Sequence, residues 1–269
     1  MAESGARSVW LIADDYGFSP GVSQCIRTLL EKERLSGTGC MTLFDDWQTE
    51  ACALARTTGD FAVGMHLTLT DFPALSTGET MPELKKLLAH PAASTIAAEA
   101  DAQLSRFREA FGRDPDFIDG HQHVHFLPPV RQWLAKRFAG VPTSQRPWLR
   151  GAPTLRAAPA LVKAKIVVAR LLARGFDAEM RRHGFTVEGP LCGFYDWRRS
   201  GAFARALDLF LDQAPDDSVI MCHPGTVDDI LRQRDIFTDA RDEERDALAS
   251  DAFPARLASA GLTLRRGRP

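Results

Sequence analysis

The sequence contains few cysteines, and they form no pattern that would bind zinc or build a disulfide framework. Its five cysteines are scattered and odd in number, and no CxxC pair occurs. A disulfide scaffold or a zinc ribbon would need paired or closely spaced cysteines. We therefore expect reduced thiols, as in a cytoplasmic protein.

Long apolar runs and an excess of charge are also missing. No stretch is long enough to span a bilayer, and no secretory signal peptide is legible at the N-terminus, so we expect the protein to stay in the cytoplasm. The formal net charge is -2, with 25% charged and 45% hydrophobic residues. This composition is typical of a globular protein and gives no electrostatic reason to expect a nucleic-acid partner.

The order of patterns along the chain predicts alternating strands and helices. Apolar runs predict strands at 9–13, 40–44, 61–67, 117–119, 145–150, 186–187, 218–222 and 262–264. Helical spacing and capping residues predict helices at 20–32, 47–57, 94–111, 128–138, 159–174, 176–183, 203–213 and 241–258. Seven or eight such units favour an α/β fold with parallel strands in a closed or nearly closed barrel. No linker divides the chain, so residues 1–269 are expected to form one domain.

The densest cluster of chemically active residues is the run DGHQHVH at 119–125, in a chain with only seven histidines. If the backbone stays extended, side chains at alternate positions emerge on one face. His121, His123 and His125 would then all face one pocket. Such a cluster is typical of a metal site or a proton-transfer site.

Polar residues fall at or just after the carboxyl ends of four predicted strands: Asp14, Asp15, His66, His121 and His223. Barrel active sites are built at this end of the strands. Taken singly, an aspartate after a strand is usually a turn residue, and a histidine in an apolar strand is usually a core residue. Five such residues at the same end are difficult to obtain from independent turns.

These side chains have the chemistry of a hydrolytic metal site. Asp15, His66 and His121 supply one oxygen and two nitrogen donors for a divalent ion, and they leave coordination positions open for water and substrate. Asp14 is then the candidate general base, and His223 the candidate proton donor to a leaving amine. Zinc suits the imidazoles, while magnesium remains an alternative.

Four motifs occur in order: ADDYG at 13–17, GMHLT at 64–68, DGHQHVH at 119–125 and CHPG at 222–225. With them the chain resembles the YdjC-like carbohydrate deacetylases. The resemblance implies a distorted (β/α) barrel related to polysaccharide deacetylases, one divalent metal ion (Mg or Zn), and removal of an acetyl group from an N-acetylated oligosaccharide or glycolipid. It also implies Asp15, His66 and His121 as metal ligands, with Asp14 as base and His223 as acid or electrostatic partner.

Five further residues are candidates for substrate binding or for support of the site. His123 and His125 adjoin the ligand His121, and Arg150 matches a mid-chain arginine of the family. Tyr195 and Trp197 are expected either to stack on a sugar ring or to cap the barrel.

The stretch 159–174 mixes apolar and cationic residues. It is expected to be an outer barrel helix, with peripheral contact to a membrane as the alternative. The oligomeric state is not fixed by the sequence, and a homodimer is compatible with it.

Two other functions compete with this interpretation. In an amidohydrolase-type barrel, His121 and His123 would form an HxH metal pair, but that pair is expected on the first strand and here it follows the fourth. A non-catalytic sugar-binding relative would have a decayed site, whereas Asp14 and His223 are both present.

Overall fold

Strand β1 (Arg7–Tyr16) lies at the centre of the computed structural model, which describes residues 7–267. It pairs in parallel with β2 (Gly37–Cys40), β8 (Val219–Cys222) and β9 (Leu262–Leu264). Eight of its ten residues are buried, as expected for a parallel strand covered on both faces. The first and last strands of the chain are thereby joined in one sheet.

The sheet curves into a distorted, incompletely closed barrel. Its order is β6-β5-β4-β3-β2-β1-β8-β7, and all pairs are parallel; the remaining strands are β3 (Ala62–Leu67), β4 (Phe117–Gly120), β5 (Trp148–Arg150), β6 (Val187–Glu188) and β7 (Leu191–Cys192). The two end strands are not paired with each other. Instead, a parallel bridge joins Pro153, beyond β5, to Leu191 in β7. The predicted parallel barrel is confirmed.

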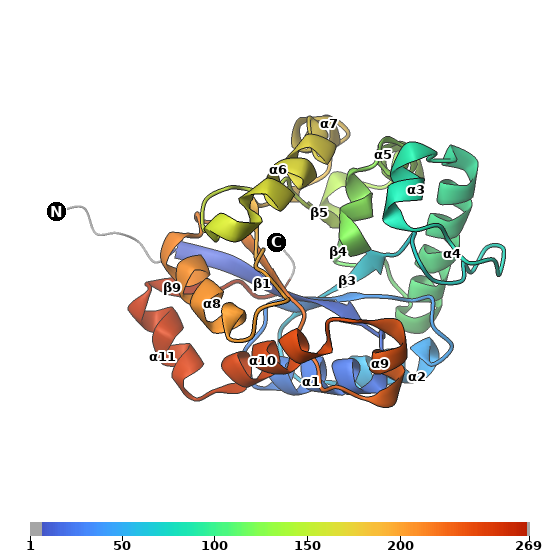
Figure 1. The fold of residues 1–269 in the computed structure, drawn as a ribbon. Helices are drawn as coiled ribbons and strands as arrows, with labels where there is room; N and C mark the ends of the chain where they lie inside the picture. The colour runs from blue at the N-terminus through green and yellow to red at the C-terminus, as the bar shows by residue number, and fades with distance from the viewer. Residues whose placement is uncertain (1–6, 268–269) are drawn as a thin grey trace.

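Helices surround the strands on the outside (Figure 1). They are α1 (Pro20–Glu31), α2 (Trp47–Arg56), α3 (Leu84–Ala89), α4 (Ala93–Phe111), α5 (Pro128–Arg137), α6 (Lys163–Leu172), α7 (Phe176–Arg182), α8 (Ala202–Gln213), α9 (Asp229–Arg234), α10 (Thr238–Ala249) and α11 (Ala252–Ser259). Short 3₁₀ helices, η1 (His121–Phe126), η2 (Thr143–Gln145) and η3 (Ala160–Val162), complete the elements. Within residues 7–267, no helix is long and apolar enough to cross a membrane.

Large side chains fill the inside of the barrel, which is therefore a packed core and not a pore. The interior cluster consists of Trp10, Ile12, Ala62, Phe117, Trp148 and Val219. The ring of Trp148 lies 5.1 Å from that of Trp10 and 4.5 Å from that of Phe117. Gly64 makes room for this stack, since a Cβ there would lie 2.4 Å from the Phe117 ring. Only the ends of the strands are left for an open site.

Two predicted elements are wrong in position or extent. The second strand covers Gly37–Cys40 and not 40–44, because glycine rather than an apolar run marks it. A Cβ at Gly37 would lie 2.3 Å from the Ala62 carbonyl oxygen, so β2 and β3 approach too closely for a side chain. The last predicted helix is two helices, α10 and α11, since Ser250 is extended with ψ of 146°. Strand β7 and helix α9 were not predicted.

The histidine run is not extended, which corrects the expectation for His121, His123 and His125. It forms the 3₁₀ helix η1, in which Gln122 and His123 have left-handed φ values of 52° and 63°. Alternation of side chains ends where the strand ends, at Gly120. The three imidazoles therefore point to different surroundings.

Candidate active site

A bulge in β1 aims two adjacent aspartates at different partners. Ala13 pairs with Thr38 and Tyr16 with Cys40, so β1 contains one more residue than β2 over this stretch. Asp15 takes up the extra residue with a left-handed φ of 68°. Both carboxylates are buried at the carboxyl end of the strand. Backbone strain of this kind clusters at functional sites.

The carboxylate of Asp15 meets two imidazoles. Its Oδ1 lies 3.4 Å from His66 Nε2 and 3.2 Å from His121 Nδ1. The three donor atoms all lie within 4.8 Å of one another. One carboxylate and two imidazoles are a donor set that suits zinc, and the set leaves positions open for water. These residues therefore fit a divalent cation.

Neighbouring groups orient these donors. Asp119 Oδ1 lies 2.6 Å from His66 Nδ1, which leaves Nε2 facing Asp15. A carboxylate behind a histidine is the usual support of a metal ligand. Arg241 Nη2 donates to Asp15 Oδ2 at 2.7 Å. Burial opposes ionisation of Asp15, but Arg241 and His121 hold the pKa of its carboxyl well below the usual range.

Asp14 lies beside this cluster between two partners. Arg150 donates from Nη1 to Asp14 Oδ2 at 2.7 Å and from Nη2 to Oδ1 at 2.6 Å, and it also forms an ion pair with Asp119. On the other side, His223 Nε2 lies 3.7 Å from Asp14 Oδ2. Burial raises the pKa of Asp14, against the opposing effect of Arg150. This carboxylate is placed to accept a proton.

His223 is held by its own backbone and by an aromatic neighbour. Its N–H donates to Glu244, which also accepts a hydrogen bond of 2.6 Å from the Tyr195 hydroxyl. The Trp197 ring packs edge-on against the imidazole, with centroids 4.5 Å apart. Burial lowers the pKa of His223 well below its usual value, so the imidazole is neutral at rest. Burial also raises the pKa of Glu244 to about 7.

The structure brings Asp14, Asp15, His66, His121 and His223 together, as the sequence predicts, and it locates the other candidates around them. Arg150 is fully buried, so it supports Asp14 rather than meeting solvent. Tyr195 is 4% exposed and its hydroxyl is engaged, which favours the barrel cap over a sugar platform. Trp197 is half-buried beside His223 and remains a candidate for stacking on a sugar ring.

His123 and His125 lie outside the donor cluster. His125 Nε2 lies 3.2 Å from the Arg150 carbonyl oxygen, and burial lowers the pKa of this imidazole to about 3. The neutral His125 thus supports the strand that carries Arg150. His123 packs against Phe194, with ring centroids 5.2 Å apart. Since His123 belongs to neither donor cluster of residues 7–267, the HxH arrangement of an amidohydrolase does not form.

Three residues of the site were not singled out from the sequence. Asp119 had a signal, since it ends a strand directly before the histidine run. Arg241 and Glu244 lie one turn apart on α10. Arg241 is 226 residues from its partner Asp15 in the sequence, and Glu244 is 21 residues from its partner His223. No local pattern identifies such long-range partners.

Comparison with known proteins agrees with this arrangement. A chitooligosaccharide deacetylase of Citrobacter koseri is 27% identical, over 94% of each chain, and a carbohydrate deacetylase of Mus musculus is 34% identical over 48% of this chain and 45% of its own. A solved Enterococcus faecalis V583 protein, named for cellobiose-phosphate cleavage, shares the fold with a TM-score of 0.68 at 20% identity, covering 97% of this chain and 98% of its own. The family model for YdjC-like proteins matches residues 8–259. The chain belongs to the YdjC-like family.

Proposed function

We propose that this chain is a metal-dependent carbohydrate N-deacetylase, which hydrolyses the acetamide of an N-acetylated sugar. The observation that carries the proposal is the position of Asp14, between Arg150 and His223 and next to the donors Asp15, His66 and His121. The relatives named chitooligosaccharide deacetylase support the same reaction and the same class of substrate.

Asp15, His66 and His121 would hold one divalent cation, zinc or magnesium. When bound, such a cation polarises a carbonyl group and makes water more acidic. The hydrogen bond from Arg241 occupies Asp15 Oδ2 and leaves Oδ1 as the donor oxygen that faces the two histidines. Asp119 keeps Nε2 of His66 directed to the same point.

Asp14 acts as the general base in this proposal. It accepts a proton from the water that attacks the acetamide carbon, and its raised pKa suits that role. Arg150 fixes the carboxylate through two hydrogen bonds, so that the base does not rotate away from the water. Arg150 is in turn fixed by its ion pair with Asp119.

His223 delivers a proton to the nitrogen as the C–N bond breaks, which releases acetate and a free amine. Because burial keeps this imidazole neutral at rest, the proton must reach it during the reaction. Asp14, 3.7 Å away, is the nearest group that has just gained one. Glu244 holds the His223 backbone, and Trp197 restricts the ring.

Acetate release tests the proposal directly. The chain is incubated with N-acetylglucosamine oligomers after chelation, and then with zinc or magnesium restored. We expect release with a restored metal, and a loss of release in Asp14→Asn and His223→Ala proteins that still bind the oligomer. Oligomer binding without release under every metal would instead indicate a non-catalytic sugar-binding protein.

A further inference from the structure

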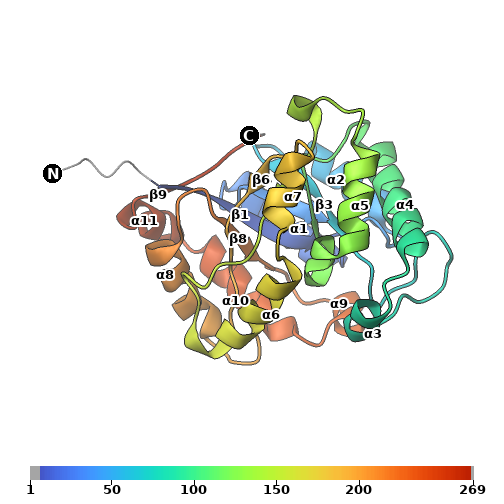
Figure 2. The ribbon, with the colours of Figure 1, turned by 90° about the horizontal axis from the view of Figure 1, so that it is seen from above.

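The exposed apolar side chains of this protein are concentrated at one end of the barrel. Within residues 7–267, the exposed large apolar side chains belong to three segments that lie along one edge of the molecule in Figure 2. Five lie between residues 155 and 171, after β5; two lie in or directly after α9, beyond β8; and Leu88 lies beyond β3. The candidate active site lies at the carboxyl ends of these same strands.

Helix α6 contributes most of this surface. Its inner side packs Ile166 and Ala169 against the barrel. Val168 and Leu171 are 58% and 67% exposed, and Leu161, just before the helix, is 68% exposed. An ordinary outer helix of a barrel places its polar side toward water. The outer helix expected within 159–174 is present as α6, with its cations exposed, but apolar residues also cover part of its outer side.

Cations surround these apolar residues. Between residues 151 and 176 the chain has five Lys or Arg residues and no acid, although the net charge of the whole chain is -2. Lys163, Arg170 and Arg174 are exposed. The nearest acid along the chain, Asp177, accepts a hydrogen bond from a backbone N–H, and Glu179 is paired with Arg131. Asp196, from the loop after β7, interacts with Lys165, but the cations outnumber it, so the local charge is positive beside the apolar side chains.

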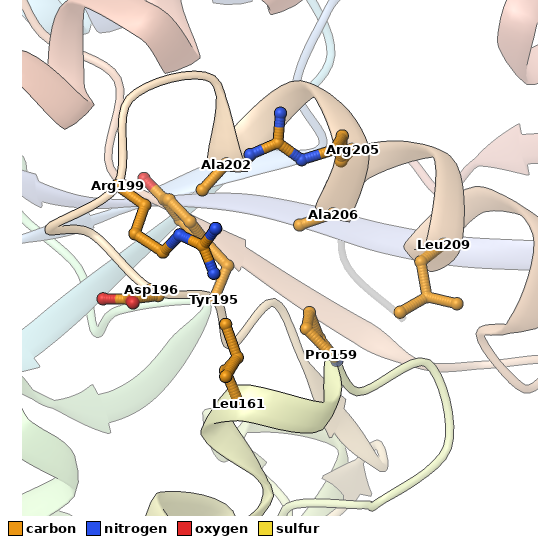
Figure 3. Close-up of a pocket in the computed structure, with 9 residues that line it drawn as sticks. All are labelled: Pro159, Leu161, Tyr195, Asp196, Arg199, Ala202, Arg205, Ala206 and Leu209. Atoms are coloured by element: carbon orange, nitrogen blue, oxygen red, sulfur yellow. The ribbon is translucent and has the colours of Figure 1, made fainter.

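The same surface continues into a shallow pocket of about 170 Å³ between η3 and α8. Figure 3 shows Leu161 on one side of this pocket and Leu209 on the other, with Arg199 and Arg205 at its edge. Figure 2 shows α6, α9 and α3 along one edge of the molecule. The apolar residues therefore lie on one side, where a single flat partner can meet them.

We propose that this face, made of Leu161, Val167, Val168 and Leu171 with the cations Lys163, Arg170 and Arg174, docks on an anionic lipid bilayer. Apolar side chains enter the boundary of the acyl chains while Lys and Arg meet acidic headgroups. Docked in this way, the barrel mouth opens toward the headgroup layer. The substrate would then be an N-acetylated sugar carried on a lipid; that consequence rests on the proposed function, whereas the docking itself does not.

A second copy of this chain is a poorer occupant of the same face. In a two-fold contact, each patch meets the identical patch of the other copy. The cations of one α6 would then lie against the cations of the other, and like charges at short distance repel. Acidic headgroups remove this repulsion.

Vesicle sedimentation tests the docking without any assay of activity. The full chain is mixed with phosphatidylcholine vesicles that contain or lack phosphatidylglycerol. We expect it to sediment only with the anionic vesicles, and less as salt is raised. The triple variant Leu161→Ser, Val168→Ser and Leu171→Ser, and the double variant Arg170→Glu and Arg174→Glu, should each bind about tenfold more weakly or worse.

The control is the double variant Lys32→Glu and Arg56→Glu, which makes the same change in net charge at exposed positions before β2 and β3, at the opposite end of the barrel. It should bind like the wild type, and circular dichroism should show all variants folded. No sedimentation of the wild type with anionic vesicles would overturn the proposal, as would unchanged binding by the triple variant. A wild-type dimer that the triple variant converts to a monomer would assign the face to self-association instead.

Discussion

Arg150 meets Asp14 fork to fork, with Nη1 2.7 Å from Oδ2 and Nη2 2.6 Å from Oδ1, at a point where neither side chain is more than 2% exposed. The same guanidinium forms an ion pair with Asp119, which supports His66. The Arg150 guanidinium therefore links the candidate base, Asp14, through Asp119 to the candidate metal ligand His66.

Replacing Arg150 should destabilise the protein as well as inactivate it. Arg150→Met leaves two buried carboxylates without their cation, and we expect the free energy of unfolding to fall by about 3–5 kcal/mol. Arg150→Lys keeps the charge but not the fork, so it should lose less stability and at least about tenfold in kcat. Urea unfolding and acetate release measure the two effects. A Met variant as stable as the wild type would show that the pair makes no net contribution.

The two adjacent aspartates should fail in different ways. Asp14→Asn removes the candidate base and keeps the candidate metal ligands, so we expect kcat to fall about 100-fold or more while zinc still binds in calorimetric titration. Asp15→Asn should abolish zinc binding and activity together. If both variants lost zinc equally, the division of roles between the two residues would be wrong.

The donor set predicts dependence on a metal. Chelation should remove activity, and zinc or magnesium should restore it. His66→Ala and His121→Ala should prevent restoration, because each removes one of three donors. His183→Ala is the matched control, since His183 is exposed and follows α7, away from the cluster. Full activity in the chelated wild type would exclude this chemistry.

Glu244 should make stability depend on pH. Its pKa rises from 4.5 to about 7 because the folded protein buries the carboxyl. Between these values the folded state holds a proton that the unfolded state has lost, so the free energy of unfolding should fall as pH rises, by up to about 3 kcal/mol. Above about pH 7 this contribution stays lost.

Glu244→Gln isolates that effect. The amide can accept from the His223 N–H and donate to the Tyr195 oxygen, but it does not titrate in this range. The fall in stability between pH 4.5 and 7 should therefore be smaller in the variant. If the free energy of unfolding, measured with urea, fell equally with pH in the two proteins, Glu244 would not be the cause.

We propose that residues 1–269 form one domain, because β1 and β9 pair and the strands described within residues 7–267 all belong to one sheet. Thermal unfolding followed by tryptophan fluorescence and by far-UV circular dichroism should then give one coincident transition. Two separated transitions would indicate independent units.

The sequence predicts the barrel and the gathering of five site residues well, because both follow from where strands end. Apolar runs identify β1, β3, β4 and β8, and parallel strands deliver the residues after them to one edge. Strand β2 was misplaced because Gly37 and Gly39 are required by close contacts with β3, and glycine carries no apolar signal.

Contacts between distant elements could not be read in this way. Arg241 and Glu244 look like ordinary polar residues of an outer helix, and only the docking of α10 on the barrel gives them Asp15 and His223 as partners. The turn of η1 depends on left-handed residues Gln122 and His123, for which the local sequence gives no glycine signal.

Because of the extra residue in β1, the two adjacent aspartates have different partners, and residue type alone does not show which aspartate has which partner. Asp14 and Asp15 have the same side chain, so their proposed roles differ only because the backbone directs the two carboxylates to different partners. Deleting one residue from β1 upstream of the pair would rotate both carboxylates without altering either. To transfer this site to another barrel, the strand register must be kept together with the side chains. The register decides which carboxylate faces the histidine donors and which faces Arg150.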